Sequence, residues 1–310
     1  MTGDAVNDLD GPRTGGDEAS EDPIASLLAV LELSDSAART NEDIFTGVSQ
    51  WMPLGRVYGG QVLAQSLIAA ARTLPDARTV HSMHGYFLRP GDSTQGITFA
   101  VDRIHDGRSF STRRTQAYQQ GVPIFSMIAS FQDEEPGLEH QEAMPDGVPE
   151  PDDLPDVEDH LKGVHPLTKR FFTDRPVDLR HIPSPIYLTV DGERMPRQAV
   201  WMRTRRALPD DPRMHRAALA YMSDLTIQES VLRAHGVGWA TRGLKVASLD
   251  HGMWWHRFGR VDEWMLYVQE SPSARGGRGL STGRIYARDG RLLASVSQEI
   301  TVRLPVAKAT

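Results

Sequence analysis

The side chains best suited to chemistry lie in the C-terminal half of this 310-residue chain. In the last strand-like run, residues 292–303, every second residue is apolar and these form one face, which Gln298 interrupts. A buried amide costs free energy unless it is hydrogen-bonded, so Gln298 needs a partner or a task. Asp224 ends an Ala-rich helical run, on or beside the stripe that should face the core. Partial burial there would raise the pKa of its carboxyl toward that of a useful general base.

Structural roles stay open for both residues. Gln298 could be a glutamine whose hydrogen bonds are satisfied inside the core, and Asp224 could be an exposed residue or a cap at the helix end. Ser248 lies in a run, residues 244–257, that is apolar on both faces, so periodicity does not place its hydroxyl.

Two motifs that look like known sites are better explained as structure. Residues 279–283 spell G-x-S-x-G, but the elbow of a serine hydrolase joins a strand to a helix and needs a downstream histidine. Here the hairpin signal Asp289-Gly290 follows, and the last histidine is His256. His81 and His84 have metal-like spacing, yet positions i and i+3 of a strand point to opposite faces, and no third ligand is near. No metal or cofactor is expected, and no Walker loop or dinucleotide fingerprint is present.

An internal duplication predicts how these residues are positioned. Each copy begins with an Ala-rich helical run, residues 61–72 and 217–225, and continues with several strand-like runs. One helix followed by an antiparallel sheet, twice, is an α+β layout in which each sheet can wrap its own helix. Paired copies would form one continuous pseudo-symmetric sheet. In the repeat, Ala129 occupies the place of Gln298, so the fold does not require a polar group there. The motif that shows the duplication recurs after 170 residues: Gly107-Arg108, Phe110-Ser111-Thr112 and Arg114 match Gly277-Arg278, Leu280-Ser281-Thr282 and Arg284.

Charge is distributed unevenly along the chain. The formal net charge is −7, from 34 basic and 41 acidic residues, but residues 1–22 carry seven acids against one arginine and residues 133–159 carry twelve acids with no Lys or Arg. The remainder is therefore basic, which suits an anionic ligand, although surface decoration explains it equally well. We expect a disordered tail (1–22), an N-terminal domain (23–132), an acidic Pro-rich linker (133–159) and a C-terminal domain (160–310).

Composition excludes several classes of protein. The chain has no cysteine, so it has no disulfide, thiolate metal site or cysteine nucleophile, and a reducing compartment such as the cytoplasm is expected. No run approaches the roughly 18 to 20 apolar residues of a membrane span, and the acidic N-terminus is unlike a secretory signal. No nucleic-acid-binding module is recognisable.

Five runs together resemble the acyl-CoA thioesterase II (TesB-type) family, and the likeness extends from about residue 25 to residue 303. The resemblance implies a double hotdog fold and hydrolysis of fatty acyl-CoA by an Asp, a Thr or Ser, and a Gln that orient water. These roles carry over to Asp224, Ser248 and Gln298. Serine stands where many relatives have threonine, and both supply a hydroxyl. The runs are residues 57–65, 81–91, 221–225, 248–256 and 263–267.

The same resemblance suggests substrate contacts. Backbone N–H groups near Gly59 and Gly60 could stabilise an oxyanion. Candidates for an acyl groove, which could equally be core residues, are Met222, Met253, Trp254 and Trp255. Candidates for the CoA phosphates are Arg203, Arg205, Arg206, Arg275 and Arg278. Hotdog proteins usually associate, so a homodimer or homotetramer is expected.

Two other functions stay open at this stage. A non-catalytic acyl-CoA-binding module would bind its ligand without releasing CoA. A hotdog enoyl-CoA hydratase or dehydratase generally needs a His beside an acid in the helix region, whereas Asp224 has Ser223 and Leu225 as neighbours.

Overall fold

The computed structural model describes residues 22–35, 42–52, 55–162 and 175–304, so the predicted tail lies outside it except for Asp22. Helices are α1 (Pro23–Leu31), α2 (Gly59–Ala71), α3 (Val157–His160), α5 (Pro212–Ser223) and α6 (Glu229–Ala234), with a 3-10 turn η1 (Pro151–Asp153). Strands are β1 (Ser34–Asp35), β2 (Asp43–Gly47), β3 (Thr79–Phe87), β4 (Ile97–Asp106), β5 (Phe110–Gln119), β6 (Val122–Gln132), β7 (Val177–Ile182), β8 (Arg197–Thr204), β9 (Lys245–Ser248), β10 (Asp250–Trp255), β11 (Met265–Arg275), β12 (Arg278–Ala287) and β13 (Leu292–Arg303).

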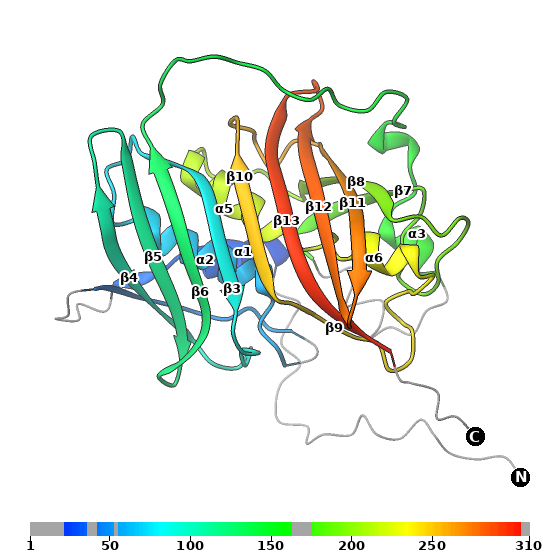
Figure 1. Cartoon of the computed structure of the whole chain (residues 1–310), viewed down its shortest axis with the longest axis horizontal. Coiled ribbons are helices and arrows are strands. Elements are labelled where there is room, and N and C mark those ends of the chain that lie inside the picture. The colour runs from blue at the N-terminus through cyan, green and yellow to red at the C-terminus, as the bar shows by residue number, and fades with distance from the viewer. Residues whose placement is uncertain (1–21, 36–41, 53–54, 163–174, 305–310) are drawn as a thin grey trace, which may run out of the picture.

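These strands form one antiparallel sheet, in the order β1-β2-β4-β5-β6-β3-β10-β13-β12-β11-β8-β7, with β9 paired to β13 (Figure 1). The two halves meet where β3 pairs with β10, with Met83 opposite Met253. Outward from this junction the order β6-β5-β4 on one side matches β13-β12-β11 on the other. The continuous pseudo-symmetric sheet expected from the duplication is thus confirmed.

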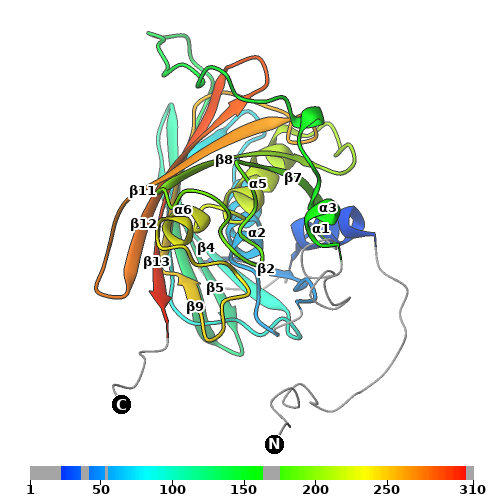
Figure 2. The ribbon, with the colours of Figure 1, turned by 90° about the vertical axis from the view of Figure 1, so that its right-hand side faces the viewer.

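Helices α2 and α5 pack against each other on one face of the sheet, each coming from a different half (Figure 2). Helix α2 is rich in alanine, a strong helix former with a small side chain, and nearly all of it is buried. Helix α5 begins at Asp211, whose carboxylate accepts the N–H of Arg213 at 2.9 Å, and has Pro212 in its first turn. The main hydrophobic core includes residues of both helices and both halves.

The acidic segment predicted as a linker leads from β6 to β7 and is docked on the second half. It passes over the ends of β10 and β13 (Figure 1). Met144 and Val148 pack against a second apolar cluster on the outer face of the sheet, around Trp201. The Trp201 indole donates to the Pro149 carbonyl at 2.8 Å, and Glu150 pairs with Arg288 at 2.7 Å. Glu142 also pairs with Arg284, so part of the acidity of this segment faces arginines of the same chain. The domain boundaries themselves stay a prediction.

The structure explains the G-x-S-x-G sequence as part of a strand. Ser281 lies inside β12, and its buried hydroxyl is 2.9 Å from that of Ser230. A Cβ at Gly283 would come within 2.4 Å of the Tyr267 ring, so close packing requires glycine there.

The prediction that His81 and His84 point to opposite faces is wrong. A β-bulge between Val80 and Ser82 shifts the register, so both rings lie on the outer face. His81 contacts Ser130 at 2.8 Å and His84 packs edge-on against Trp254. Within the described ranges, no three or more His, Asp or Glu residues gather as they would around a metal ion. No helix in the described part of the chain is long and apolar enough to cross a membrane.

Candidate active site

The structure brings Asp224, Ser248 and Gln298 together. Asp224 follows the last residue of α5 and is 3% exposed. The Gln298 amide nitrogen Nε2 donates to Asp224 Oδ1 at 2.9 Å and to Ser248 Oγ at 2.9 Å. The Ser248 hydroxyl donates to the same Asp224 oxygen at 3.3 Å. We call these residues the trio; their three side chains form a closed set of hydrogen bonds around one carboxylate oxygen.

An irregularity in the pairing of β9 and β10 with β13 determines where Ser248 lies. Ser248 and Gly252 are four positions apart, but their partners on β13, Ile300 and Ser297, are only three positions apart. The extra residue breaks the run into β9 and β10 and re-aims the strand, as bulges do beside many active sites. This explains why the alternation of the sequence could not assign a face to Ser248.

The first half contributes the N-terminal end of α2. A Cβ at Gly59 would meet Asp224 Oδ2 at 2.7 Å, and a Cβ at Gly60 would meet the Tyr221 carbonyl oxygen at 2.4 Å. Only glycine allows this close approach between the start of α2 and the end of α5. The Gly60 N–H also stabilises the Asp224 carboxylate. The site therefore contains residues of both halves.

Burial raises the pKa of Asp224 to about 6. Hydrogen bonds from Gln298, Ser248, the Gly60 N–H and Gln228 oppose this shift. The two helix ends also act in opposite senses, because the C-terminus of α5 disfavours a negative charge and the N-terminus of α2 favours one. The result is a carboxylate that is ionised at neutral pH and basic enough to accept a proton.

We predict that activity follows the ionisation of Asp224. If its carboxylate is the base, kcat/KM should rise about tenfold per pH unit below pH 6 and level off above it. Thiol release measured between pH 4.5 and 8 checks this. CoA carries a phosphate that titrates near pH 6, so an acyl-pantetheine substrate, which lacks it, is the control. A flat profile across this range would contradict the role of Asp224.

Two polar neighbours of the trio were missed by the sequence reasoning. His251 on β10 is buried, and its Nδ1 contacts Gln298 Oε1. Gln228, just before α6, directs its amide nitrogen at Ser248 Oγ, 3.4 Å away. His251 lies three residues after Ser248, within the run 248–256 that resembles the family. Its closeness to Ser248 in the sequence was the one feature that could have marked it as a neighbour of the site. Gln228 lies in an irregular turn, where no periodicity marks it.

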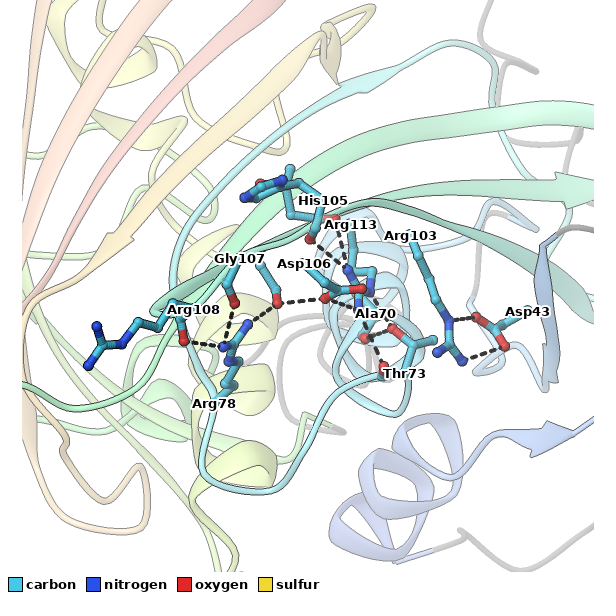
Figure 3. Close-up of polar contacts among 12 residues, drawn as sticks. Asp43, Ala70, Thr73, Arg78, Arg103, His105, Asp106, Gly107, Arg108 and Arg113 are labelled. Carbon is cyan, nitrogen blue, oxygen red and sulfur yellow. Dashed lines mark hydrogen bonds and ion pairs between the residues drawn. The ribbon is translucent and has the colours of Figure 1, made fainter.

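Among the described residues of the first half, the polar groups near the end of α2 are arranged differently from the trio (Figure 3). The strand register corrects the repeat alignment: Gln298 pairs with Ser281, whose repeat counterpart Ser111 pairs with Phe131, so Phe131 and not Ala129 takes the place of Gln298. Arg113, also on β5, has a side chain that is 1% exposed. The Arg113 guanidinium donates to Thr73 Oγ1, just beyond the end of α2, and to Asp106 Oδ1, each at 2.7 Å. An arginine thus occupies the space beside the helix end where the second half has its carboxylate.

The predicted acyl contacts are dispersed. Met222 and Met253 are fully buried in the main core, and Trp255 is 5% exposed there. Trp254 points to the outer face of the sheet, away from the helices and the trio, because neighbouring strand residues alternate. The structure therefore does not bring Trp254 to the trio, and it assigns Met222 and Trp255 to core packing.

The predicted phosphate contacts separate into two groups. Arg203 and Arg205 each approach Asp178 at 3.5 Å, and Arg206 pairs with Asp22. Arg275 and Arg278 line a common groove of about 230 Å³ at the turn between β11 and β12, and Arg278 also pairs with Glu299 at 2.9 Å. The rest of the lining comes from the β11–β12 hairpin, from the end of α6 with the residues that follow it, and from the C-terminal end of β13: Ala274, Gly277, Leu232, His235, Val237, Val302 and Leu304.

Comparison with known proteins identifies the family of this chain. A family model described as acyl-CoA thioesterase matches residues 166–301, and one described as acyl-CoA thioesterase N-terminal domain matches residues 48–132. Acyl-CoA thioesterase 2 of Haemophilus influenzae is 37% identical over 290 residues, which cover 91% of this chain and 98% of that protein.

Solved structures extend the comparison to the fold. The acyl-CoA thioesterase II TesB2 of Mycobacterium marinum is 44% identical, with a TM-score of 0.73 over 90% of this chain and 98% of that one. A protein from Alicyclobacillus acidocaldarius described as having a hot dog fold has the same TM-score at 20% identity, over 91% and 99% of the two chains. The expected double hotdog fold is confirmed. The chain belongs to the acyl-CoA thioesterase family.

Proposed function

We propose that this protein hydrolyses fatty acyl-CoA to a free fatty acid and CoA, using water oriented by Asp224, Ser248 and Gln298. The observation that carries the proposal is a buried carboxylate held by an amide and a hydroxyl beside the start of α2. Membership of the acyl-CoA thioesterase family supports the reaction. The test is release of free thiol from acyl-CoA by the wild type and by variants of the trio.

A thioester suits a site with this composition. The leaving thiolate has a conjugate acid of pKa about 8.5, so it departs without a strong general acid. In the proposed step, the water oxygen bonds to the thioester carbonyl carbon while Asp224 takes one proton from the water. The tetrahedral intermediate then collapses and the C–S bond breaks. The CoA thiolate takes the proton that Asp224 had accepted, which restores the Asp224 carboxylate, and the fatty acid keeps the oxygen of the water.

The N-terminal end of α2 is the proposed oxyanion site. The first N–H groups of a helix have no acceptor within the helix, and the helix dipole favours negative charge at that end. Because the Gly60 N–H already serves Asp224, we assign the Gly59 N–H to the oxygen that becomes negative during attack.

We further propose that the groove with Arg275 and Arg278 binds the CoA phosphates. Replacing both arginines with alanine should raise KM about tenfold and leave kcat nearly unchanged, because the contacts persist through the reaction. KM of the wild type should also rise with salt, more steeply than that of the double variant. Arg103→Ala, which removes an exposed ion pair with Asp43 in the first half, is the control. A salt-independent KM would contradict this assignment.

The alternatives have less support. Both ring nitrogens of His251 contact protein atoms, Ser223 Oγ and Gln298 Oε1, so its ring is not free to act on an enoyl thioester as a hydratase would require. A binding module would retain acyl-CoA without thiol release. We also propose a cytoplasmic location, supported by the lack of cysteine, and a homo-oligomer, which light scattering coupled to size exclusion would test.

A further inference from the structure

His251 connects the two elements that hold the proposed catalytic groups. Its ring is 1% exposed and lies on β10, between the end of α5 and β13. On one side its Nε2 is 3.0 Å from the hydroxyl of Ser223, the residue before Asp224. On the other side its Nδ1 contacts the amide oxygen of Gln298. The ring thus touches both the helix end and the catalytic strand, but none of the groups that would face substrate.

The hydrogen bonds around Gln298 require one amide orientation. With Nε2 toward the trio, its two N–H groups serve Asp224 Oδ1 and Ser248 Oγ. The reversed amide would place a carbonyl oxygen 2.9 Å from a carboxylate oxygen, where two acceptors repel each other. The amide oxygen therefore faces His251, and it needs a donor there because the surroundings are dry.

Only one neutral tautomer of His251 supplies that donor. Burial lowers the pKa of His251 to about 4, so the neutral ring carries a single N–H at neutral pH. If that proton is on Nδ1, it donates to Gln298, and Nε2 accepts the Ser223 hydroxyl proton. The Ser223 hydroxyl, which also lies 2.9 Å from the Ala220 carbonyl, has one proton, and in this tautomer that proton serves Nε2.

We propose that His251, as the Nδ1–H tautomer, is a positioning residue that fixes the amide of Gln298 with its N–H groups toward Asp224 and Ser248. This inference rests on the proposed roles of those residues. Loss of the Nδ1 donor would let the amide rotate, which removes two donors from the trio and leaves substrate binding intact. The effect should therefore appear in kcat and not in KM.

A matched pair of variants separates positioning from packing. Asparagine places its amide nitrogen near the site of Nδ1, whereas glutamine reaches the site of Nε2. His251→Asn should keep kcat for acyl-CoA hydrolysis within about fivefold of the wild type. His251→Gln should lower kcat about 10- to 100-fold, with KM within twofold. In a Gln298→Ala background, His251→Gln should cost less than about threefold, because the proposed effect acts through Gln298.

The proposal is overturned if the two His251 variants lose activity equally and in proportion to their melting temperatures, or if the losses add to that of Gln298→Ala. A second measurement uses only the wild-type protein and does not depend on its enzymatic activity. Nitrogen-15 NMR of histidine-labelled wild-type protein should show a His251 ring protonated at Nδ1 and bare at Nε2, and the opposite tautomer would refute the assignment. Failure of the wild type to release thiol would instead refute the proposed function, independently of the tautomer.

Discussion

Replacing Asp224 with asparagine should reduce turnover of acyl-CoA by about 10²- to 10⁴-fold, because it removes the only carboxylate of the trio. Asparagine has nearly the same shape, and its Oδ1 can still accept from Gln298 and Ser248, so KM should change little. The measurement is thiol release from short, medium and long acyl-CoAs at equal concentrations of folded protein. A variant that keeps near-normal turnover would remove Asp224 from the mechanism.

The same variant should not lose stability at neutral pH. The carboxyl of Asp224 has a pKa of about 6 in the folded protein against an ordinary value of 3.8, so folding favours its protonated form. This contribution is fully present below about pH 4 and is lost as the pH rises through about 6, which costs the wild type up to about 3 kcal/mol at neutral pH. The melting temperature of Asp224→Asn relative to the wild type should therefore rise between pH 4 and pH 7. A variant less stable than the wild type throughout this range would show that its inactivity reflects unfolding.

Replacing Gln298 with alanine should lower kcat about 10²- to 10³-fold, because one amide holds both Asp224 and Ser248. The hydrogen bond from Gln298 also lowers the pKa of Asp224, so its loss should move the acidic limb of the pH profile to higher pH. Thiol release across pH 5 to 9 measures both effects.

The duplicated half provides a reason to expect this variant to fold, since an apolar residue, Phe131 on β6, occupies the corresponding position in the sheet. Thr115→Ala, which removes a fully buried polar side chain of the first half, is the matched control and should leave the pH profile in place. If Gln298→Ala lowers activity without moving the profile, then Gln298 does not act through the Asp224 carboxylate.

The sequence pattern singled out two members of the trio, Gln298 and Asp224, for physical reasons that also hold in the structure. Gln298 interrupts an apolar strand face, and the structure buries it completely. Asp224 follows a helix whose last seven residues, 217–223, are all buried, and it is itself buried against the start of α2. In both cases the period of the apolar residues, two for the strand and 3.6 for the helix, indicated a polar side chain in an apolar environment.

Sequence reasoning failed where the period is interrupted or where partners lie far apart in the chain. Ser248 and His81 both adjoin β-bulges, which no alternation reveals. Docking of the acidic linker depends on a few apolar residues, such as Met144, whose partners lie more than fifty residues away. Trp254 and Trp255 were both candidates for the acyl groove, although strand alternation sends them to opposite faces.

The most direct test of the central claim is where the oxygen of water goes. One turnover in water enriched with oxygen-18, with protein in excess over acyl-CoA, should place one heavy oxygen in the released fatty acid and none in Asp224. Mass spectrometry of the acid and of the peptide containing Asp224 measures both. Heavy oxygen in the Asp224 carboxyl, together with an unlabelled acid, would contradict activation of water and show that Asp224 attacks the thioester to form an anhydride.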